Sequence, residues 1–442
     1  MKTKQDIFNL VEEHDVKFIR LMFTDIFGQG KNVAITANQL EDALNNKVFF
    51  DGSSIQGFAR IEESDMVLHP DIETFMLLPW KPQKGREARI ICDVYTTDGK
   101  PFMGDPRNIL KKVLKEADEL GYTFHVGPEC EFFIFQSDDE GEPTTITHDK
   151  AGYFDLGHID NGENLRREIA LTLEEMGFEI EASHHECADG QHEIDFKYGE
   201  ALLTADRIMT FKLVVKTLAR SNNLHATFMP KPVFGIHGSG MHINMSLSDK
   251  DGNNVFYDES SSDGLSSIAN SYIAGILEHI KEMTAVTNPL VNSYKRLVPG
   301  YEAPIYIAWS SSNRTPLVRI PASRGAGTRV ELRCPDPSAN PYLALACCLA
   351  SGLDGIKRGL KAPDSVDENI YHMSSDELDE KGVESLPRDL GQAAKMFAES
   401  EFIKEVVGEH LHKTYAKAKK KEYKEYTRQV SKWEVDEYLG IY

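Results

Sequence analysis

A nine-residue run, GPECEFFIF at positions 127–135, places two glutamates inside an otherwise apolar segment. If the run forms one β-strand, its side chains alternate between two faces, and Glu129 and Glu131 share a face with two phenylalanines. The other face carries a cysteine, a phenylalanine and an isoleucine, so we expect both faces to be buried. Two neighbouring carboxylates in a buried place repel each other and lose hydration, so the run requires a positively charged partner.

A second acidic pair lies in EASHHECADGQHEIDF, residues 181–196. Asp189 and Gly190 are typical of a two-residue hairpin turn, which predicts that Glu186 lies directly opposite Glu193. Directly opposed glutamates destabilise a hairpin unless a cation neutralises them. An exposed acidic hairpin without a ligand is the alternative interpretation.

Two further segments place polar side chains on one face of a strand. In GSGMHINMSLSD, four apolar side chains alternate with polar ones led by His242, and in TRVELRCPDP the acid is Glu331. A lone histidine on such a strand is often a hydrogen-bonded core residue. Together, however, the four segments supply five carboxylates and one histidine. This set predicts two divalent-metal sites for hard cations such as Mg²⁺ or Mn²⁺, which would also lower the pKa values of the acids.

Residues 295–333 reverse the charge of an otherwise acidic chain. The 442 residues include 49 Lys and Arg against 70 Asp and Glu, a formal net charge of −21, yet this segment contains six arginines and two glutamates. Guanidinium groups bind phosphate and carboxylate through paired hydrogen bonds, so we expect an anionic partner. Ion pairing with neighbouring acidic surface is the alternative. Two metal ions beside arginines are what phosphoryl transfer from a nucleotide requires.

Composition excludes several other classes of function. The acidic balance argues against nucleic acid or an anionic membrane as the main partner. The N-terminal segment lacks the apolar core of a signal peptide, and no apolar run approaches membrane-spanning length. The six cysteines form no zinc-type pairs of motifs, which suits reduced thiols and predicts a cytoplasmic protein.

The order of elements favours an α+β fold, because predicted strands and helices mix without a regular βαβ period. Asp105 is typical of a helix N-cap, with Pro106 at the first helical position. We therefore place a domain boundary near residues 98–105. The sequence contains no convincing internal repeat and no Walker-type phosphate loop.

Seven motifs, in order, resemble those of type I glutamine synthetase: DGSSI, GPECEFF, SHHECADGQHEIDF, GSGMHINMSL, NSYKRLVPGYEAP, VRIP and ELRCPDPSANPYLALA. The resemblance extends from about residue 15 to the end. It implies a β-grasp domain over residues 1–103 and a catalytic domain over residues 104–442, built on an antiparallel sheet flanked by helices. It also implies a homo-oligomer, a dodecamer of two hexameric rings with active sites between neighbouring subunits.

The resemblance also implies roles for individual residues. One metal ion would be held by Glu131, Glu186 and Glu193, and the other by Glu129, His242 and Glu331. The implied ATP-binding residues are Glu181, Asn244, Ser246, Arg319 and Arg329. The implied glutamate-binding residues are Glu131, Gly238, Arg296 and Arg333. The implied catalytic residues are Asp51 from the neighbouring subunit, Glu302 on a loop that closes over the site, and Arg314 beside the transferred phosphate.

The implied reaction is the ATP-dependent ligation of ammonia to L-glutamate. The γ-carboxylate attacks the terminal phosphate of ATP to give γ-glutamyl phosphate and ADP, and ammonia then displaces phosphate to give L-glutamine. Asp51 and Glu302 would gather ammonium and help remove its proton, while loop closure excludes water. Two alternatives stay open: a related ligase with another amine acceptor, and a non-catalytic structural or regulatory relative.

Four positions concern regulation or depart from the family pattern. Arg60 resembles the arginine that mediates glutamine feedback inhibition in the Gram-positive branch, whose members also bind transcription regulators. Tyr371 lies near the modified tyrosine of the adenylylated branch, but its surroundings differ, which favours the non-adenylylated branch. His237 stands where the family usually has asparagine, and this change is expected to affect glutamate contact or pH dependence. Cys130 stands where proline is common, on the face away from the carboxylates.

Overall fold

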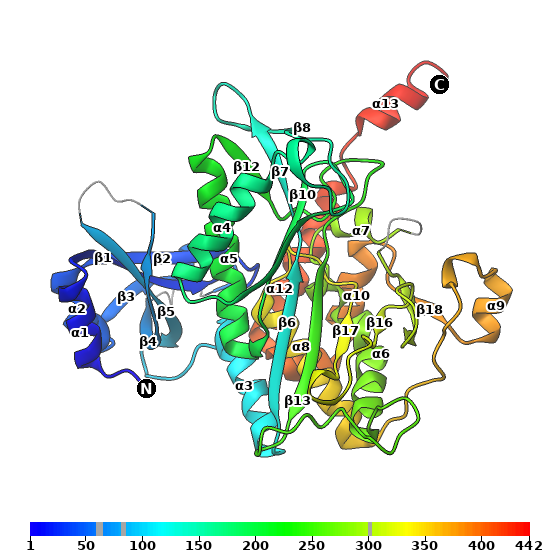
Figure 1. The fold of residues 1–442 in the computed structure, drawn as a ribbon, viewed down its shortest axis with the longest axis horizontal. Helices are drawn as coiled ribbons and strands as arrows, with labels where there is room; N and C mark the ends of the chain where they lie inside the picture. The colour runs from blue at the N-terminus through cyan, green and yellow to red at the C-terminus, as the bar shows by residue number, and fades with distance from the viewer. Residues whose placement is uncertain (59–64, 81–84, 299–302) are drawn as a thin grey trace.

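The computed structural model describes residues 1–58, 65–80, 85–298 and 303–442 (Figure 1). In these ranges a small N-terminal sheet is joined to a larger body in which helices cover two sheets. The predicted α+β fold is therefore confirmed. No helix in the described ranges is both long and apolar enough to cross a membrane.

The N-terminal sheet has five strands in the order β2-β1-β5-β4-β3. The central neighbours β1 and β5 are parallel and the other pairs are antiparallel, which is the β-grasp arrangement that the resemblance implies. A capping box between Thr3 and Asp6 begins the first helix. The elements are α1 (Lys4–Glu13), β1 (Val16–Thr24), β2 (Gly30–Thr36), α2 (Leu40–Leu44), β3 (Val48–Asp51), β4 (Asp65–Leu78) and β5 (Arg86–Thr96).

The larger body contains a six-stranded sheet in the order β11-β6-β13-β17-β16-β15, antiparallel except for its last pair. Its strands are β6 (Thr123–Cys130), β11 (Gly199–Glu200), β13 (Met241–Ser248), β15 (Trp309–Ser310), β16 (Val318–Arg319) and β17 (Val330–Leu332). A second sheet has the order β12-β7-β10-β9, with β8 paired to β7. Its strands are β7 (Phe132–Ser137), β8 (Pro143–Thr147), β9 (Ile180–His185), β10 (Gln191–Phe196) and β12 (Leu224–Thr227). The short strands β14 (Tyr306–Ile307) and β18 (Glu384–Ser385) pair separately.

The prediction that GPECEFFIF forms one strand is wrong. The run is divided between β6 and β7, which belong to different sheets, and Glu131 lies at the crossover. The Glu131 backbone N–H donates to Gly240 O at 3.1 Å, while its carboxylate accepts from Gly240 N at 2.9 Å and Gln191 Nε2 at 2.7 Å. The crossover thus satisfies a carboxylate that a continuous strand would leave without donors. The predicted burial of both faces is confirmed, since Phe133 packs in a small cluster and Phe132 in the main core.

Helices cover the sheets of the larger body. The longest are α5 (Ala201–Ser221) and α6 (Ser267–Thr287), and the buried α8 (Pro341–Arg358) begins at a proline as predicted. The others are α3 (Pro106–Glu119), α4 (Glu163–Glu175), α7 (Ser293–Arg296), α9 (Ser375–Glu380), α10 (Leu390–Glu399), α11 (Glu401–Val407), α12 (Glu409–Tyr426) and α13 (Lys432–Tyr438). Short 3₁₀ turns occupy Ala37–Gln39, Gly52–Ser54, Gly157–Ile159, Gly325–Gly327 and Ile370–His372. Helix α13 projects from the body at the C-terminal end (Figure 1).

Helix α3 begins as the sequence predicts. The Asp105 carboxylate accepts from Arg107 N at 3.0 Å, and Pro106 occupies the first turn. The same carboxylate accepts from Val94 N of β5 at 2.8 Å, so the cap also attaches the helix to the N-terminal sheet. Because Asp105 is fully buried, desolvation raises its pKa to about 7.

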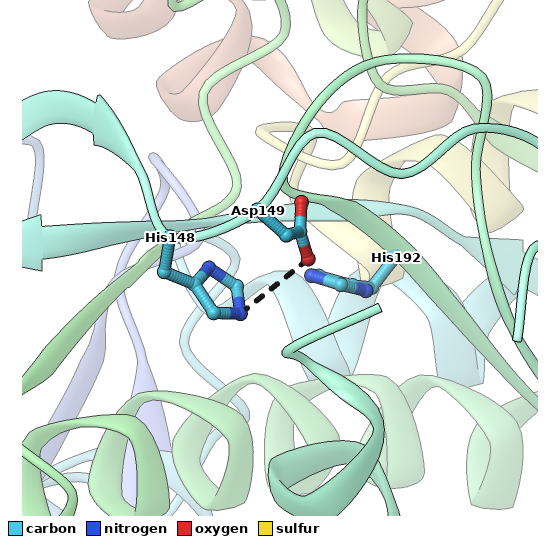
Figure 2. A group of neighbouring side chains, drawn as sticks. All are labelled: His148, Asp149 and His192. Carbon is cyan, nitrogen blue, oxygen red and sulfur yellow. Dashed lines mark ion pairs between the residues drawn. The ribbon is translucent and has the colours of Figure 1, made fainter. Parts of the chain in front are cut away.

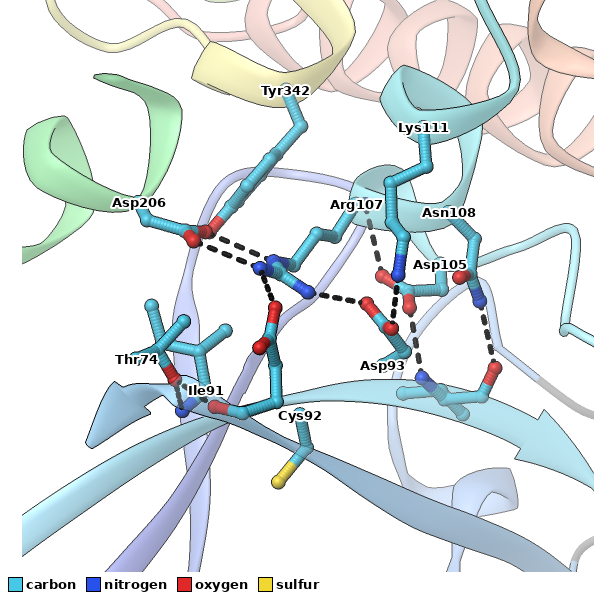
Figure 3. Close-up of polar contacts among 12 residues, drawn as sticks. Thr74, Ile91, Cys92, Asp93, Asp105, Arg107, Asn108, Lys111, Asp206 and Tyr342 are labelled. Atoms are coloured by element: carbon cyan, nitrogen blue, oxygen red, sulfur yellow. Dashed lines mark hydrogen bonds and ion pairs between the residues drawn. The ribbon is translucent and has the colours of Figure 1, made fainter. Parts of the chain in front are cut away.

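Arg107 of α3 joins the N-terminal sheet to the larger body (Figure 3). Its guanidinium donates to Asp93 of β5 at 2.6 Å, to Asp71 of β4 at 2.8 Å, and to both oxygens of Asp206 on α5 at 3.0 and 2.9 Å. Burial alone would lower the pKa of Arg107, but the carboxylates, Asp206 first, raise it. The two parts of the fold therefore meet at a cation that is fully paired. Tyr342 of α8 also donates to Asp206, at 2.7 Å.

Candidate active site

Three neighbouring strands bring together one of the two predicted metal-binding groups. His242 of β13 is the register partner of Glu129 on β6, and Glu331 of β17 is the partner of Asn244 on β13. His242 Nδ1 lies 3.0 Å from Glu129 Oε2, and Asn244 Nδ2 donates to Glu129 Oε1 at 2.9 Å. One ligand atom from each of Glu129, His242 and Glu331 lies within 4.8 Å of the others. The alternation in GSGMHINMSLSD produces this arrangement, because Met241, Ile243 and the other apolar members pack into the core below.

Two arginines neutralise the most buried acid of this group. Glu331 accepts from Arg319 of β16 at 2.7 Å, and it also pairs with Arg333 just beyond β17. Its side chain is 1% exposed, so a carboxylate there requires such partners. Glu129 is stabilised in its charged form as well. Burial would raise its pKa, but hydrogen bonds from His242 and Asn244 lower it to about 2.

The acidic hairpin formed by β9 and β10 differs from the predicted one. Asp189 and Gly190 do form a turn, since Gln191 N donates to Ala188 O at 3.0 Å, but the strand ladder resumes at Glu186, whose N–H donates to Gln191 O at 2.8 Å. Residues 187–190 are therefore a four-residue loop. The Asp149 carboxylate supports this loop, because its Oδ1 accepts from Gly190 N at 2.8 Å.

The longer loop changes which residues face each other. Glu193 lies opposite His184, so the predicted direct opposition of Glu186 and Glu193 is wrong. His184 stands between the two acids instead, with Nδ1 3.4 Å from Glu186 Oε1 and Nε2 3.3 Å from Glu193 Oε1. The shift is two residues, an even number, so both glutamates still point to the same face. Asp195, two residues after Glu193, extends that face.

Carboxylates outnumber cations on this hairpin face. Burial raises the pKa of Glu186 to about 9, and the neighbouring charges of Glu131 and Glu193 act in the same direction. Burial and the other acids likewise raise the pKa of Glu193 well above its ordinary value and that of Asp195 to about 7. Carboxylate-rich surroundings of this kind fit a hard divalent cation, whose charge would hold the carboxylates ionised. His184 and Asp195 were absent from the predicted ligand set, although the two-residue spacing from Glu186 and Glu193 indicated both.

A buried polar cluster supports the hairpin from behind (Figure 2). Asp149 lies between His148, whose Nε2 is 3.6 Å away, and His185, whose Nε2 is 3.2 Å away. His192 Nδ1 accepts from Arg166 Nη1 at 2.8 Å, and burial and that arginine keep the pKa of His192 well below its ordinary value. The neutral ring therefore carries its hydrogen on Nε2 and has no lone pair there for a metal ion. We infer that this cluster stabilises the hairpin and does not bind a metal ion.

Most of the predicted ATP-binding residues line one cavity of about 340 Å³ beside Glu129. Those that line it are Glu181, Asn244, Ser246 and Arg329. Arg329 Nε donates to Asn244 Oδ1 at 2.9 Å, so the amide connects the cavity wall to Glu129. Tyr198 and His125 form another part of the wall, which offers aromatic surface. Arg319 pairs with Glu331 instead of lining this cavity.

The residues predicted to hold glutamate lie next to Glu131. Gln191 Nε2 donates both to Glu131 and to Gly238 O, the latter at 3.2 Å. A Cβ atom on Gly238 would lie 2.4 Å from Pro230 O, so the backbone here leaves no room for a side chain. Arg296 is 2% exposed and donates to Cys334 O at 2.6 Å. In this structure Arg296 therefore shapes the loop that follows Arg333.

Two family models together match almost the whole chain. Residues 15–97 match the model "Glutamine synthetase, beta-Grasp domain", and residues 103–438 match "Glutamine synthetase, catalytic domain". The chain belongs to the glutamine synthetase family. It is 62% identical over 440 residues to a glutamine synthetase of Clostridium saccharobutylicum and 56% identical over 441 residues to that of Staphylococcus aureus strain MRSA252. Each of these matches covers 100% of this chain and 99% of the relative.

Two solved structures have the same architecture. The structure "GmaS/ADP complex-Conformation 1" has a TM-score of 0.90 and 33% identity, and the match covers 98% of this chain and 99% of that one. The structure "CryoEM Plasmodium falciparum glutamine synthetase" has a TM-score of 0.87 and 25% identity, and the match covers 99% of both chains.

Four predicted residues of this glutamine synthetase family member belong to other segments of the chain. Asp51 ends β3 in the N-terminal sheet, where its Oδ1 accepts from Ser53 N at 2.8 Å and Ser53 Oγ at 2.6 Å. Arg314 is exposed on the connection between β15 and β16. Glu302 and Arg60 lie outside the described residues.

Proposed function

We propose that the chain is a glutamine synthetase, which ligates ammonia to L-glutamate at the expense of ATP through γ-glutamyl phosphate. The observation that carries this proposal is the group formed by Glu129, His242 and Glu331, which adjoins both an acidic hairpin and a cavity. Catalysis of phosphoryl transfer requires metal-binding carboxylates next to cations that neutralise phosphate, and both are present at the edge of this cavity.

The chain's own side chains would orient the nucleotide. Glu181, Ser246 and Arg329 line the cavity, and Asn244 connects it to Glu129. Arg319 and Arg333, both paired with Glu331, would neutralise the negative charge that develops as the terminal phosphate of ATP is transferred. Arg314 is exposed and lies shortly before Arg319 in the sequence. It is our candidate for a contact with the transferred phosphate.

The residues fit two Mg²⁺ or Mn²⁺ ions. Glu129, His242 and Glu331 would hold one, and Glu131, Glu186 and Glu193 would hold the other. When bound, such ions neutralise phosphate oxygens and polarise the phosphorus centre. Gln191 Nε2 and the Gly240 N–H both donate to Glu131, and such contacts would orient this carboxylate as a metal ligand.

Gly238, Arg296 and Arg333 would hold L-glutamate with its γ-carboxylate toward the nucleotide. The carboxylate oxygen bonds to the terminal phosphorus as ADP leaves, and the nitrogen of ammonia then bonds to the carbon of the γ-carboxyl group as phosphate leaves. Asp51, contributed by a neighbouring subunit, and Glu302 would gather ammonium and remove its proton. This assignment requires an oligomer, and we propose the dodecamer of two hexameric rings.

Several finer features belong to the same proposal. We place the enzyme in the cytoplasm, in the non-adenylylated, feedback-inhibited branch, with Arg60 as the residue through which glutamine inhibits. All six cysteines lie in the described ranges and none forms a disulfide, which agrees with a reducing compartment. Regulatory protein partners of the kind known in that branch are expected, whereas direct nucleic-acid binding is not.

The decisive experiment measures phosphate release from ATP and Mg²⁺, with glutamate alone, with glutamate and ammonium, and with glutamate and a polyamine. Release that requires both glutamate and ammonium and yields glutamine supports the proposal. Release only with another amine would retain the ligase chemistry and change the acceptor. No release with any amine, from folded and metal-loaded oligomer, would leave the non-catalytic alternative.

A further inference from the structure

Phe154 has a backbone conformation that its residue type disfavours. Its φ is +61°, in the left-handed region, where a large L side chain is rare. The other non-glycine residues with positive φ in the described ranges are of types that tolerate this region, Asp15, Asn46 and Asn223. Phe154 is therefore the member of this group whose backbone conformation is strained.

The strain lies in a tight turn on the connection between β8 and α4. Asp155 N donates to Gly152 O at 3.1 Å, which closes a four-residue turn with Tyr153 and Phe154 at its centre. Positive φ at the second central residue only is the pattern of a type II turn, in which glycine or asparagine usually occupies that position. Asparagine would therefore fit the backbone at position 154 better than phenylalanine does.

Burial within the chain does not explain the phenylalanine. Phe154 is 59% exposed, and the neighbouring Tyr153 is exposed as well. A side chain with this exposure adds little to the hydrophobic core, while the strained backbone lowers the free energy of unfolding. The contacts that Phe154 does make are with the acidic hairpin.

Phe154 contacts the hairpin through both its backbone and its ring. Its N–H donates to His185 O at 3.1 Å, at the end of β9. Its ring meets the His184 ring at an interplanar angle of 85°, with the centroids 4.7 Å apart. Tyr153 stacks on Phe154 at 4.0 Å and meets His184 edge-to-face at 5.7 Å. Aromatic contacts of this kind have a preferred geometry, so they restrict the orientation of the His184 ring.

His184 is the residue through which these contacts reach the proposed metal site. Its Nδ1 lies 3.4 Å from Glu186 Oε1, and its Nε2 lies 3.3 Å from Glu193 Oε1. Because a carbonyl oxygen can only accept, Nδ1 also donates to His185 O at 3.3 Å, the same oxygen that accepts from Phe154 N. A group that fixes the orientation of metal-binding carboxylates raises their affinity for the metal.

We propose that Phe154 is a positioning residue for the metal ion assigned to the acidic hairpin. Its strained turn holds the phenyl ring against His184. His184 in turn holds Glu186 and Glu193 in one orientation, so the strain supports an ordered set of ligands. The inference rests on the divalent-metal site of the proposed function, and it is independent of which amine is the acceptor.

The test is calorimetric titration of the metal-free, full-length protein with Mn²⁺, in the absence of ATP and glutamate. The parent protein carries Glu129→Gln, which removes a ligand of the other proposed ion and leaves the hairpin ligands intact. Phe154→Asn suits the turn but lacks the ring, and it should bind Mn²⁺ roughly tenfold more weakly than the parent. Phe154→Tyr keeps the ring and should bind as the parent does. Leu156→Asn removes an apolar side chain that is 83% exposed on the same connection, and it should also bind as the parent does.

Thermal unfolding of the same metal-free proteins separates positioning from packing. Phe154→Asn should unfold at the midpoint of the parent or at a higher one, because it relieves strain and removes little buried surface. Weaker Mn²⁺ binding together with an equal or higher midpoint is the expected result. The role is overturned if Phe154→Asn binds Mn²⁺ as the parent does, if its midpoint falls, or if Phe154→Tyr loses binding.

Two further outcomes distinguish this role from the proposed function. If the wild type binds no Mn²⁺, both the metal sites of the proposed function and the role of Phe154 are refuted. If the wild type forms no glutamine but Phe154→Asn still weakens Mn²⁺ binding tenfold, the ligase activity is refuted and the positioning role is supported.

Discussion

Two ionic clusters in this molecule each contain three carboxylates but differ in how those carboxylates are paired. At the seam between the N-terminal sheet and the larger body, one buried guanidinium, Arg107, serves three carboxylates, and every guanidinium nitrogen has an acceptor. On the β9–β10 hairpin face, Glu186, Glu193 and Asp195 converge with only His184 between them among the described residues. Both clusters are largely buried, so exposure to solvent does not distinguish them. They differ in whether each carboxylate has a cation within hydrogen-bond distance.

The comparison distinguishes charged groups that stabilise the fold from charged groups that are available to bind an ion. Carboxylates that each accept from a buried guanidinium contribute to stability when both partners are retained. Carboxylates that face one another repel, and an external cation can relieve that repulsion. The pKa directions agree with this distinction. Carboxylates raise the pKa of Arg107, while at the hairpin burial and neighbouring acids raise the pKa of Glu186 to about 9. Removal of one charge should therefore have opposite effects on stability in the two clusters.

The largest effect is expected for Arg107→Met. The substitution leaves Asp206 buried without a cation and Asp93 with Lys111 as its only cation, and the free energy of unfolding should fall by about 3–5 kcal/mol. Urea unfolding followed by circular dichroism measures the change. Arg358→Met, which removes a half-exposed arginine paired with Asp354, should cost much less, because solvent screens that pair. Equal losses in the two variants would contradict the importance assigned to burial at the seam.

At the hairpin, Glu193→Gln should reduce activity and increase stability together. Glutamine formation should fall roughly 100-fold or more, as the loss of one transition-state electrostatic contact typically gives. The metal-free protein should unfold at a higher temperature than the wild type, because one member of a repelling group is gone. Glu140→Gln, on the exposed β7–β8 turn, should change neither quantity. If metal-free Glu193→Gln is less stable than the wild type, the hairpin carboxylates do not repel one another as proposed.

Divalent metal should stabilise the wild type without any change of sequence. At about 100 times the dissociation constant, Mn²⁺ or Mg²⁺ binding to the folded state is worth about 2.7 kcal/mol. Differential scanning fluorimetry with and without chelator measures the shift in unfolding midpoint. Glu129→Gln should lose part of the shift, because Glu129 belongs to only one of the two proposed sites. If metal addition leaves the unfolding midpoint unchanged, the carboxylates do not form the proposed divalent-metal sites.

Sequence reasoning found the polar strand faces because a period of two is visible locally. The group Glu129, His242 and Glu331 followed from alternation and from motif resemblance, and the register of β6, β13 and β17 brings it together. Local signals also predicted two other features. Motif resemblance predicted the β-grasp sheet, and an N-cap aspartate followed by proline predicted the start of α3.

What the sequence left unresolved depends on contacts between distant segments. The four-residue loop of the hairpin is held by Asp149, which is 41 residues from Gly190, and no local pattern signals that partner. The division of GPECEFFIF depends on Gly240, which lies 109 residues from Glu131. In the sequence Arg107 and Arg89 look like ordinary cations of a helix and a strand, although one is fully paired and the other is not.

At low pH the smallest expected effect is that of a substitution at Asp105, the helix cap at the seam, and the pH dependence of that effect tests the comparison. Its pKa is about 7 in the folded protein against an ordinary value of 3.8, so between these two pH values the folded state binds more protons than the unfolded state. The contribution of Asp105 to stability is therefore greatest at low pH and is lost as the pH rises toward 7.

Asp105→Asn keeps a good capping residue and removes this titration, at a cost of about 1 kcal/mol for the weakened bond to Val94 N. At about pH 4 the wild type should be the more stable protein, and this advantage should vanish and then reverse as the pH rises to 7, because the raised pKa costs the wild type about 4 kcal/mol over that range while the variant does not titrate. Urea titrations at several pH values measure the difference. Titration of the hairpin acids cancels in this difference, because the substitution leaves those acids unchanged. A constant difference would mean that Asp105 is ionised throughout, and that the positive charge of Arg107 extends to the cap as well as to its three direct partners.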